Sequence, residues 1–378
     1  MKGALWVCER DVRKFIRQPS IMLAAVVGPF ITLVLLGFAF GGTITHMPIA
    51  LVNNSQSPAS YSFTDLLRNE QNCSYGGVNC ANAFSVTNAP DLDSAQALVR
   101  SGVVKAAVYI PSNFGTPIND SVLPVITVYI DNTDPLSAAA ISGLMAQAGS
   151  QASAQIQVNS QSSFPVTVDM TNMYRDVFYI EFMAPGSLIQ SIMFASIIGG
   201  GISILFDKQR GIIEGYLVTP LKQYEIVVGV LLAGVIKATF SAFTILVLAI
   251  IFVGVRPVVN ITDYALIFIT IFLTALGIIS MMTAYAVRAP APEVYQFTAF
   301  PINLVLYFTS GAVYPIDGFP PWMRAIANIN PQAYAIHALR LAMYKGATLS
   351  AVIGDFAYLS IFTGLMVLLA TVAFRRAL

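Results

Sequence analysis

The stretch that decides the fold is 206-FDKQRGIIEGYLVTPLKQYEIVVGVLL-232, a charged and proline-broken segment between two apolar runs. Its first half carries four charged residues: Asp207, Lys208, Arg210 and Glu214. Thr219-Pro220 then interrupts the chain, because proline cannot continue a helix and disfavours helical backbone in the residue before it. The pattern predicts a short amphipathic helix held against a membrane face, followed by a bend. Two interpretations stay open: a plain connector, or a docking element that a partner protein pushes.

The composition indicates a membrane protein. Only 10% of the 378 residues are charged, and 56% are apolar. An average soluble domain has roughly 25% charged residues, so the composition excludes a set of soluble domains; it also excludes a disordered chain. The net charge of +1, without a long basic stripe, argues against nucleic-acid binding.

Six stretches reach the length of about 20 mostly apolar residues that a transmembrane helix needs. They are residues 21–40, 185–206, 226–253, 264–287, 294–313 and 352–374. We therefore expect a polytopic α-helical membrane protein with six transmembrane helices.

Lys and Arg residues predict the orientation, since they accumulate on the cytoplasmic side. Eleven of the 20 lie before residue 21, between the second and third spans, after the fourth span, or at the end of the chain. The long segment between the first and second spans has only four: Arg68, Arg100, Lys105 and Arg175. We therefore expect a multi-pass protein of the cell membrane with both termini in the cytoplasm.

Residues 42–181 are polar enough to fold in water, between the first span (21–41) and the other five (182–378). Strands are predicted at 48–54, 103–111 and 125–132, which are rich in β-branched and aromatic residues. Helices are predicted near 60–69, over 91–102 with Gly102 as its stop, and from Asp134-Pro135 to about 158. Because strands alternate with helices, we expect a large extracytoplasmic α/β domain between the first two transmembrane helices.

Two of the three cysteines lie in this domain, in the stretch 72-NCSYGGVNC-80. The turn-forming residues between Cys73 and Cys80 make a closed loop sterically easy, and the external compartment permits a disulfide. Two free thiols or a metal pair are the alternatives, although no His, Cys, Asp or Glu lies inside the loop. Cys8, on the cytoplasmic side, is expected to be unpaired.

Residue patterns for catalysis and metal binding are missing from the sequence. The two histidines, His46 and His337, lie near opposite ends, and no HExxH, CxxC or G-x-S-x-G pattern occurs. A Walker phosphate loop, G-x-x-x-x-G-K-[ST], is also missing. The Gly199-Gly200-Gly201 run lies inside the second span, where small residues permit close helix packing. We therefore expect neither a metal site nor an enzyme activity of this chain by itself.

A second broken segment, 310-SGAVYPIDGFPPWMRAIANINPQAYAIHALR-340, lies between the fifth and sixth spans. Its prolines prevent one continuous helix, and Trp322 and Tyr334 suit a membrane interface. We expect residues 314–350 to form broken, partly re-entrant helices at the outer leaflet, packed in protein or lining a cavity.

Both segments resemble the ABC-2 type permeases of ABC transporters. In the first segment the matching residues are Arg210, Gly211, Glu214, Gly215, Leu217, Thr219, Pro220, Glu225 and Gly229. In the second they are Gly311, Pro315, Pro321, Trp322, Asn330, Pro331, Tyr334 and Arg340. Because the two motifs occur in the expected order, with six spans and a large external loop, the resemblance covers nearly the whole chain.

The resemblance implies the membrane subunit of an ABC exporter. Two six-span permeases, identical or different, would pair and dock on two separate ATP-binding cassette subunits, which would bind ATP and Mg; no cofactor is expected on this chain. ATP-driven closure would push the coupling segment 206–225, whose expected residues are Asp207, Lys208, Arg210, Gly211, Glu214, Gly215, Thr219 and Pro220.

Residues 1–20 would form an interfacial amphipathic helix beside that segment, with basic residues toward lipid headgroups. Its expected residues are Arg10, Arg13, Lys14, Phe15 and Arg17. A purely topological basic anchor is the alternative.

The transport pathway would lie between the two protomers. Mildly polar candidates in the spans are Ser191, Ser196, Thr298, Asn303 and Thr309, although Ser and Thr in spans often bond their own backbone. Lys237 either snorkels or pairs inside the bundle, or contacts an anionic substrate or lipid. His337 is expected to be a structural polar group. So few charges favour an amphipathic, drug-like or lipid-like substrate over small ions.

Two rival hypotheses remain. The chain could be a non-transporting sensor whose external domain recognises a ligand and signals to a cytoplasmic ATPase or kinase. It could also be a passive channel, which would conduct without ATP.

Overall fold

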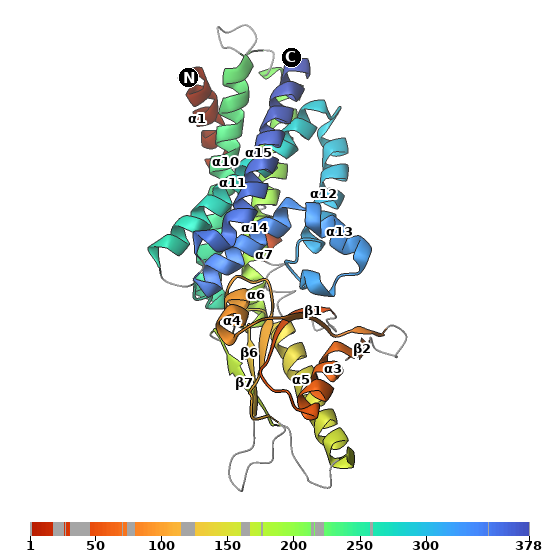
Figure 1. Cartoon of the computed structure of the whole chain (residues 1–378). Helices are drawn as coiled ribbons and strands as arrows, with labels where there is room; N and C mark the ends of the chain where they lie inside the picture. Colours follow the sequence, from red (N-terminus) through yellow and green to blue (C-terminus); the bar gives the residue numbers. More distant parts are fainter. Residues whose placement is uncertain are drawn as a thin grey trace. The chain divides into compact units, whose positions relative to one another are not determined.

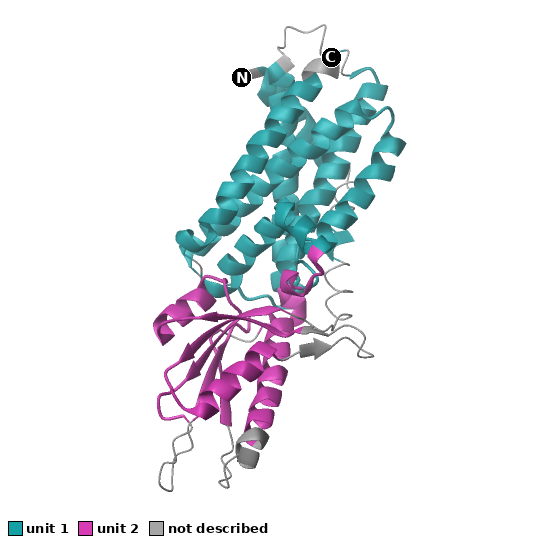
Figure 2. Cartoon of the chain, turned by 45° about the vertical axis from the view of Figure 1, so that its right-hand side comes forward, with its two compact units in different colours: residues 1–39, 183–314, 322–378 teal, residues 40–182, 315–321 magenta. Residues whose placement is uncertain are grey.

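The computed structural model describes residues 2–17, 26, 28–30, 46–69, 71–73, 80–114, 125–159, 167–174, 177–212, 215, 223–257, 260–346 and 348–377, with the backbone alone at residues 2, 71–73, 80, 81, 154–159, 223 and 375–377. The chain divides into two compact units (Figure 2). The helical unit comprises residues 1–39, 183–314 and 322–378, and the α/β unit comprises residues 40–182 and 315–321.

The helical unit consists of long helices with short breaks (Figure 1). Its elements are α1 (Lys2–Ile16), α7 (Ala184–Phe194), the π-helix η1 (Ala195–Ile202), α8 (Ser203–Gln209), α10 (Gln223–Leu248), the π-helix η2 (Ala249–Val253), α11 (Ile261–Arg288), α12 (Pro292–Phe308), nearly all of α13 (Pro321–Ile329), α14 (Pro331–Arg340), the π-helix η4 (Leu341–Lys345) and α15 (Leu349–Ala377). Helix α11 is central, since it packs against α7, η1, α10, α14 and α15.

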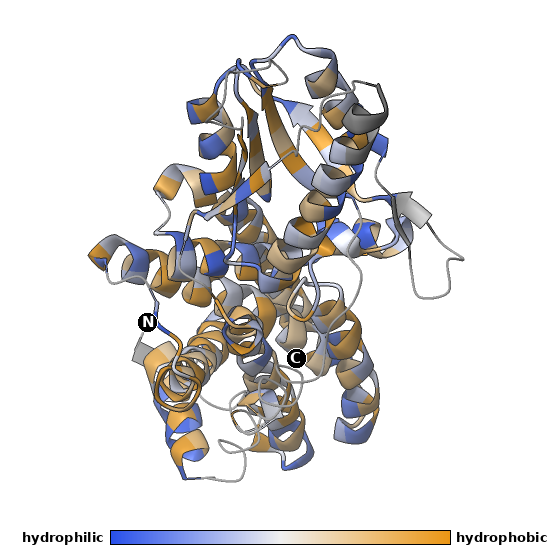
Figure 3. Ribbon diagram, turned by 90° about the horizontal axis from the view of Figure 1, so that it is seen from below, coloured by the Kyte–Doolittle hydropathy of each residue, from blue (hydrophilic) through white to orange (hydrophobic). Residues whose placement is uncertain are grey.

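Four helices within the described residues are long and apolar enough to cross a membrane: Tyr179–Gln209, Tyr224–Val253, Ile261–Arg288 and Leu349–Phe374. Hydrophobic residues dominate the helices of this unit (Figure 3). These four correspond to the predicted second, third, fourth and sixth spans. A membrane protein with several spanning helices is therefore supported, whereas the full count of six is not.

The other two predicted spans differ from these four. Residues 21–41 lie mostly outside the described part of the chain. Helix α12 ends at Phe308 after 17 residues, about 25 Å at 1.5 Å per residue, which is short of a hydrocarbon core of about 30 Å. Thr309 ends the helix, and Gly311 follows with a positive φ of 77°, so the predicted span 294–313 is shortened by a turn.

The α/β unit is built on a five-stranded sheet in the order β4-β1-β5-β6-β7. Its elements are β1 (Met47–Asn53), α3 (Pro58–Asn69), β2 (Gln71–Cys73), β3 (Cys80–Asn82), β4 (Phe84–Asn88), α4 (Leu92–Arg100), β5 (Ala106–Ile110), β6 (Val125–Ile130), α5 (Pro135–Asn159), β7 (Thr167–Asn172), α6 (Tyr179–Phe182) and the 3-10 turn η3 (Ile316–Gly318). Strand β1 is parallel to β4 and β5, β6 is antiparallel to β5, and β7 is parallel to β6.

Local sequence signals explain the central elements of this unit. The side chain of Asp91 accepts a hydrogen bond from the Ser94 N–H at 2.7 Å and so caps α4. Gly102, which follows α4, has a φ of 76°, a conformation that glycine adopts without strain. One core cluster joins Ala50 of β1, Val99 of α4 and Ala107 of β5.

The sequence did not predict strands β4 and β7. Both lie at the edges of the sheet, and their sequences, FSVTN and TVDMTN, are largely exposed. Because an edge strand needs no continuous apolar run, its hydrophobic pattern is too weak to distinguish it from a loop.

Candidate functional site

Helix α1 packs along α10 through one stripe of its surface. The stripe has the spacing of one helix face and consists of Ala4, Val7, Cys8, Asp11 and Phe15, all of them buried. At Gly229 of α10 a built Cβ atom would lie 2.6 Å from the Ala4 carbonyl oxygen and 2.7 Å from the Val7 Cβ. Glycine at this position therefore lets the two backbones approach closely.

A cluster of charges joins α1 to the end of α8. The buried carboxylate of Asp207 accepts hydrogen bonds from Arg10 and from the Lys14 Nζ, the latter at 2.8 Å. Arg10 also donates to Asp11 at 2.7 Å, and Lys14 donates to the Ser203 Oγ at 3.1 Å. Two basic residues expected to face lipid headgroups thus bind a carboxylate of the same chain. We call Arg10, Asp11, Lys14 and Asp207 the α1–α8 charge cluster.

Lys237 of α10 extends the α1–α8 charge cluster into the bundle. It is 4% exposed, and its Nζ donates to the Gly199 carbonyl oxygen at 2.5 Å. The carboxylates of Asp11 and Asp207 attract it electrostatically, and the ammonium of Lys14 repels it. The ammonium group is therefore bonded within the helical unit, at the π-helix η1.

The expected coupling residues separate into buried and exposed ones. Asp207 is buried, whereas Lys208 and Arg210 are exposed, and the Arg210 guanidinium lies 5.8 Å from the centre of the Phe206 ring. Gly211 ends the helix with a φ of 71°, and Gly215 is exposed. Glu214, Thr219 and Pro220 lie outside the described residues.

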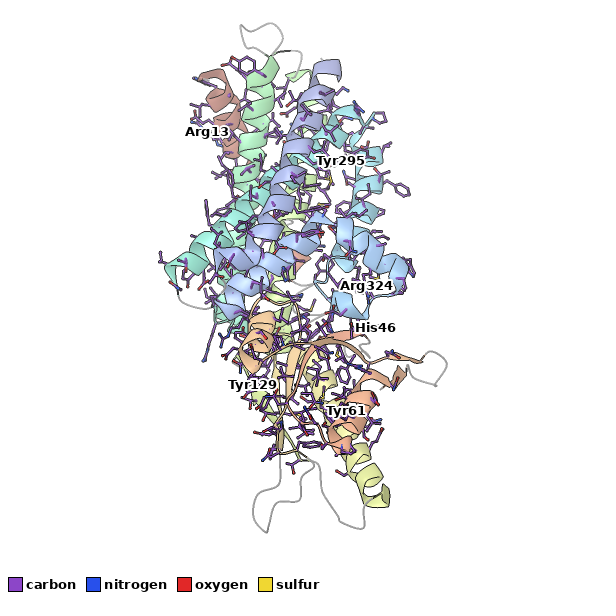
Figure 4. The ribbon with its side chains drawn as sticks, viewed as in Figure 1. Arg13, His46, Tyr61, Tyr129, Tyr295 and Arg324 are labelled. Carbon is purple, nitrogen blue, oxygen red and sulfur yellow. The ribbon has the colours of Figure 1, made fainter. Side chains whose placement is uncertain are left out.

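The remaining residues expected on the interfacial helix have different surroundings. Arg13 pairs with Glu9 on the exposed side of α1 (Figure 4), and Arg17, just after the helix, is also exposed. Phe15 is buried and lies near Gly199. Leu5, Trp6 and Ile16 leave a second, exposed apolar side on α1.

The candidate pathway residues bond mainly within their own helices. The hydroxyls of Ser191, Ser196 and Thr309 donate to backbone carbonyls three or four residues earlier, at 2.7, 2.7 and 2.8 Å. Thr298 shares a hydrogen bond with the Tyr285 hydroxyl. The Oδ1 atom of buried Asn303 differs, since it has no hydrogen-bond partner among the described residues.

The outer motif is held together by two polar side chains. Asn330 caps α14 by accepting from the Gln332 N–H at 2.9 Å, and its Nδ2 donates to the Leu306 carbonyl at 2.6 Å. Arg340 donates to the carbonyls of Gly311 and Ala312 at 2.7 and 3.3 Å. These bonds tie α14 back to the end of α12 and to the turn that follows it.

The prolines of the outer motif mark breaks between short elements. Pro315 precedes η3, Pro321 begins α13 and Pro331 begins α14. Trp322 is 67% exposed. The segment is therefore a series of broken helices, and its re-entrant position in a membrane stays a prediction.

Two features of the helical unit were not assigned from the sequence. The carboxylate of Asp263, in the first turn of α11, is 1% exposed and has no hydrogen-bond partner among the residues described. His337 contacts Asp355 of α15, with 2.8 Å between Nδ1 and Oδ2. The local sequence signals neither feature. His337 and Asp355 are 18 residues apart in the chain, and nothing in the sequence beside Asp263 shows that its carboxylate is buried.

The predicted disulfide lies in the hairpin of β2 and β3. These strands are antiparallel, and Cys73 is directly opposite Cys80. The side chains of both cysteines lie outside the described part of the structure, so the disulfide stays a prediction. Cys8 is free and buried.

Comparison with known proteins gives the family. The family described as "ABC-2 family transporter protein" matches residues 19–372. The chain belongs to this ABC-2 family. The matched residues include both broken motifs, so the match confirms the resemblance to ABC-2 type permeases that these motifs indicated.

Related proteins are transport permeases by name. The chain is 21% identical to the "Probable multidrug ABC transporter permease YbhS" of Escherichia coli K12, over 90% of this chain and 88% of that protein. It is 19% identical to YbhR of the same organism, over 98% of both chains. It is 26% identical to the "Putative transport permease ycf38" of Cyanophora paradoxa, over 43% of this chain. This last match covers 55% of the Cyanophora protein, about half of its length.

Proposed function

We propose that this ABC-2 family chain is the membrane permease subunit of an ABC exporter. It would pair with a second permease protomer and with two separate ATPase subunits. The observation that carries the proposal is the family match over residues 19–372, together with relatives named as ABC transporter permeases over nearly the full length. The sequence lacks a Walker phosphate loop, so a separate subunit would supply ATP hydrolysis.

The end of α8 is the proposed contact with that ATPase. Lys208 and Arg210 are exposed there, while Asp207 is fixed to α1 through Arg10 and Lys14. The start of α1 and the end of α15 lie at the same end of the helical unit as this segment (Figure 1). The shared end supports the proposal that both termini and the coupling segment 206–225 are cytoplasmic.

The proposed substrate is an amphipathic, drug-like or lipid-like molecule that moves out of the cytoplasm. The spans carry few charges, and Lys237, the one lysine buried among the side chains that the structure describes, bonds to a backbone carbonyl. Two of the relatives are named as multidrug permeases. The α/β unit would lie outside the membrane on the exit side.

Purification of a tagged chain from its native membrane tests the proposal. We expect an ATPase with a Walker phosphate loop to co-purify, and its ATP hydrolysis to respond to ethidium, a fluorescent amphipathic cation. Glu214→Ala should reduce that response at least tenfold, while Asp65→Ala, an exposed residue of α3, should not. If no such ATPase co-purifies, or if both variants behave alike, the exporter proposal fails.

A further inference from the structure

The second span contains a π-helix of eight residues, η1, between α7 and α8. A π-helix in the middle of an α-helix is rare and often occurs at functional positions, because its wider turn disturbs the regular hydrogen-bond ladder. This π-helix includes the run Gly199-Gly200-Gly201. The glycines have no side chains of their own, so neighbouring helices can fill the space beside the backbone.

The three glycines of this run face different neighbouring helices. A Cβ atom added at Gly199 would lie 3.7 Å from the Lys237 side chain of α10 and 3.8 Å from the Phe15 ring of α1. At Gly200 a Cβ would overlap Ile279 of α11, which also fills the space at Gly234 of α10.

Gly201 faces α12. A Cβ there would overlap the ring and hydroxyl of Tyr295 (labelled in Figure 4). The run is therefore a place where residues of α1, α10, α11 and α12 all lie against span two.

Lys237 is the polar contact at this meeting point. Its ammonium is buried, and it donates to the Gly199 carbonyl. A charge buried in a membrane segment is costly unless it is paired, so a lysine placed here needs its bond and its nearby carboxylates. Those carboxylates, Asp11 and Asp207, belong to the cluster that holds α8 to α1. Through its bond to Gly199 and its attraction to these carboxylates, the lysine links η1 to the α1–α8 charge cluster.

We propose that η1 is a hinge in the second span and that Lys237 is the positioning residue that holds it. When the Lys237–Gly199 bond is made, a displacement of α8 is transmitted through η1 to α7. When the bond is absent, α8 moves while α7 does not follow. The coupling of α8 to α7 rests on the proposed function, since an ATPase must supply the displacement. The hinge itself, with Lys237 holding η1, concerns this chain alone.

Hydrogen exchange on the purified chain tests the hinge without any partner. We expect Lys237→Met to accelerate amide exchange in residues 195–205 at least tenfold, with no change in α15. Methionine keeps most of the stem but removes the donor. The matched control is Thr244→Val, which removes a half-buried α10 hydroxyl whose bond, among the described residues, is to the Phe240 carbonyl of its own helix. Unchanged exchange in residues 195–205 of Lys237→Met would overturn the proposal.

A second pair of variants keeps the hinge testable if Lys237→Met does not fold. Gly201→Ala should disturb η1 by overlap with Tyr295, and Gly201→Ala combined with Tyr295→Ala should restore wild-type exchange. Gly364→Ala, where a Cβ meets nothing within 4 Å, is the control. If amide exchange in residues 195–205 is as fast in the double variant as in Gly201→Ala, the contact between Gly201 and Tyr295 does not maintain the conformation of η1. That result would reject the hinge.

The coupling statement is tested in the complex with its ATPase. Lys237→Met should keep ATP hydrolysis within twofold of wild type and reduce ethidium transport per ATP at least tenfold, and Lys237→Arg should recover part of it. Equal transport per ATP in Lys237→Met and wild type would overturn coupling through Lys237. A wild-type complex that transports nothing would reject the exporter function, while the exchange result would still decide the hinge.

Discussion

Asp207 shows how one side chain can determine the place of a whole helix. Its carboxylate is buried and binds two cations of α1, Arg10 and Lys14. Removing one partner of a buried ion pair leaves the other charge buried without compensation, which lowers stability. Exposed ion pairs contribute little to stability. The same helix offers an exposed pair for comparison, between Glu9 and Arg13.

We expect Asp207→Asn to lower the free energy of unfolding by about 1–3 kcal/mol, less than for a fully buried pair because Arg10 and Lys14 are partly exposed. Glu9→Gln should change it by less than about 0.5 kcal/mol. Thermal unfolding in detergent measures both. Similar values for the two variants would contradict the structural role of the α1–α8 charge cluster.

The three cysteines make a second prediction at this scale. If Cys73 and Cys80 are bonded, the denatured, unreduced chain takes up one maleimide, and the reduced chain takes up three. In the folded chain, burial, with a smaller contribution from Asp11, raises the pKa of the Cys8 thiol. Labelling of Cys8 should therefore be slow at neutral pH and rise as the pH increases, since only the thiolate reacts. Three labels without reduction would exclude the disulfide.

At the scale of elements, the contact of α1 with α10 depends on close backbone approach. A Cβ at Gly229 would meet the backbone oxygen of Ala4 at 2.6 Å, and backbone cannot rotate away as a flexible side chain can. The two helices must therefore separate, if only locally, when any side chain is introduced at this position.

Gly229→Ala should destabilise the helical unit by about 1–3 kcal/mol, the usual range for overpacking. It should also increase maleimide labelling of buried Cys8 at least tenfold in the folded protein, because α1 moves away from α10. Gly354→Ala, with open space beside it, is the matched control and should change neither quantity. Labelling at the wild-type rate in Gly229→Ala would show that α1 does not depend on this contact.

The elements differ in how far the sequence could predict them. Helix α4 and strands β5 and β6 have strong local signals, such as the Asp91 cap and the β-branched run in β6. Strands β4 and β7 depend on the neighbours with which they pair. Helix α12 is shorter than its apolar run because the chain turns at Gly311, where Arg340 binds the carbonyl from 29 residues away. Such long-range partners have no signal in the local sequence.

At the scale of the whole molecule, composition predicted a membrane protein, and the resemblance of the two broken motifs predicted the ABC-2 family, which the family match confirms. The distribution of Lys and Arg predicted an orientation, but the contacts of those residues were not predictable. Arg10 and Lys14 look like lipid-facing residues in the sequence, and in the structure they bind Asp207. A charge pattern gives the sign of a surface, whereas pairing depends on which helices meet in space.

The proposed orientation can be measured with introduced cysteines. Ser112→Cys, in an exposed part of the α/β unit, should react with a membrane-impermeant maleimide in intact cells. Lys208→Cys, at the exposed end of α8, should react only after the membrane is permeabilised. The reverse pattern would contradict cytoplasmic termini and an external α/β unit.

The most direct test of the exporter assignment is transport by the purified complex in sealed liposomes. The chain and its co-purified ATPase are reconstituted, and ethidium movement is followed by fluorescence with ATP, without ATP, and with a Walker-loop variant of the ATPase. We predict movement only with ATP and the intact ATPase. Equal movement without ATP would indicate a passive channel. ATP hydrolysis without movement of ethidium or of a fluorescent phospholipid would contradict the exporter assignment.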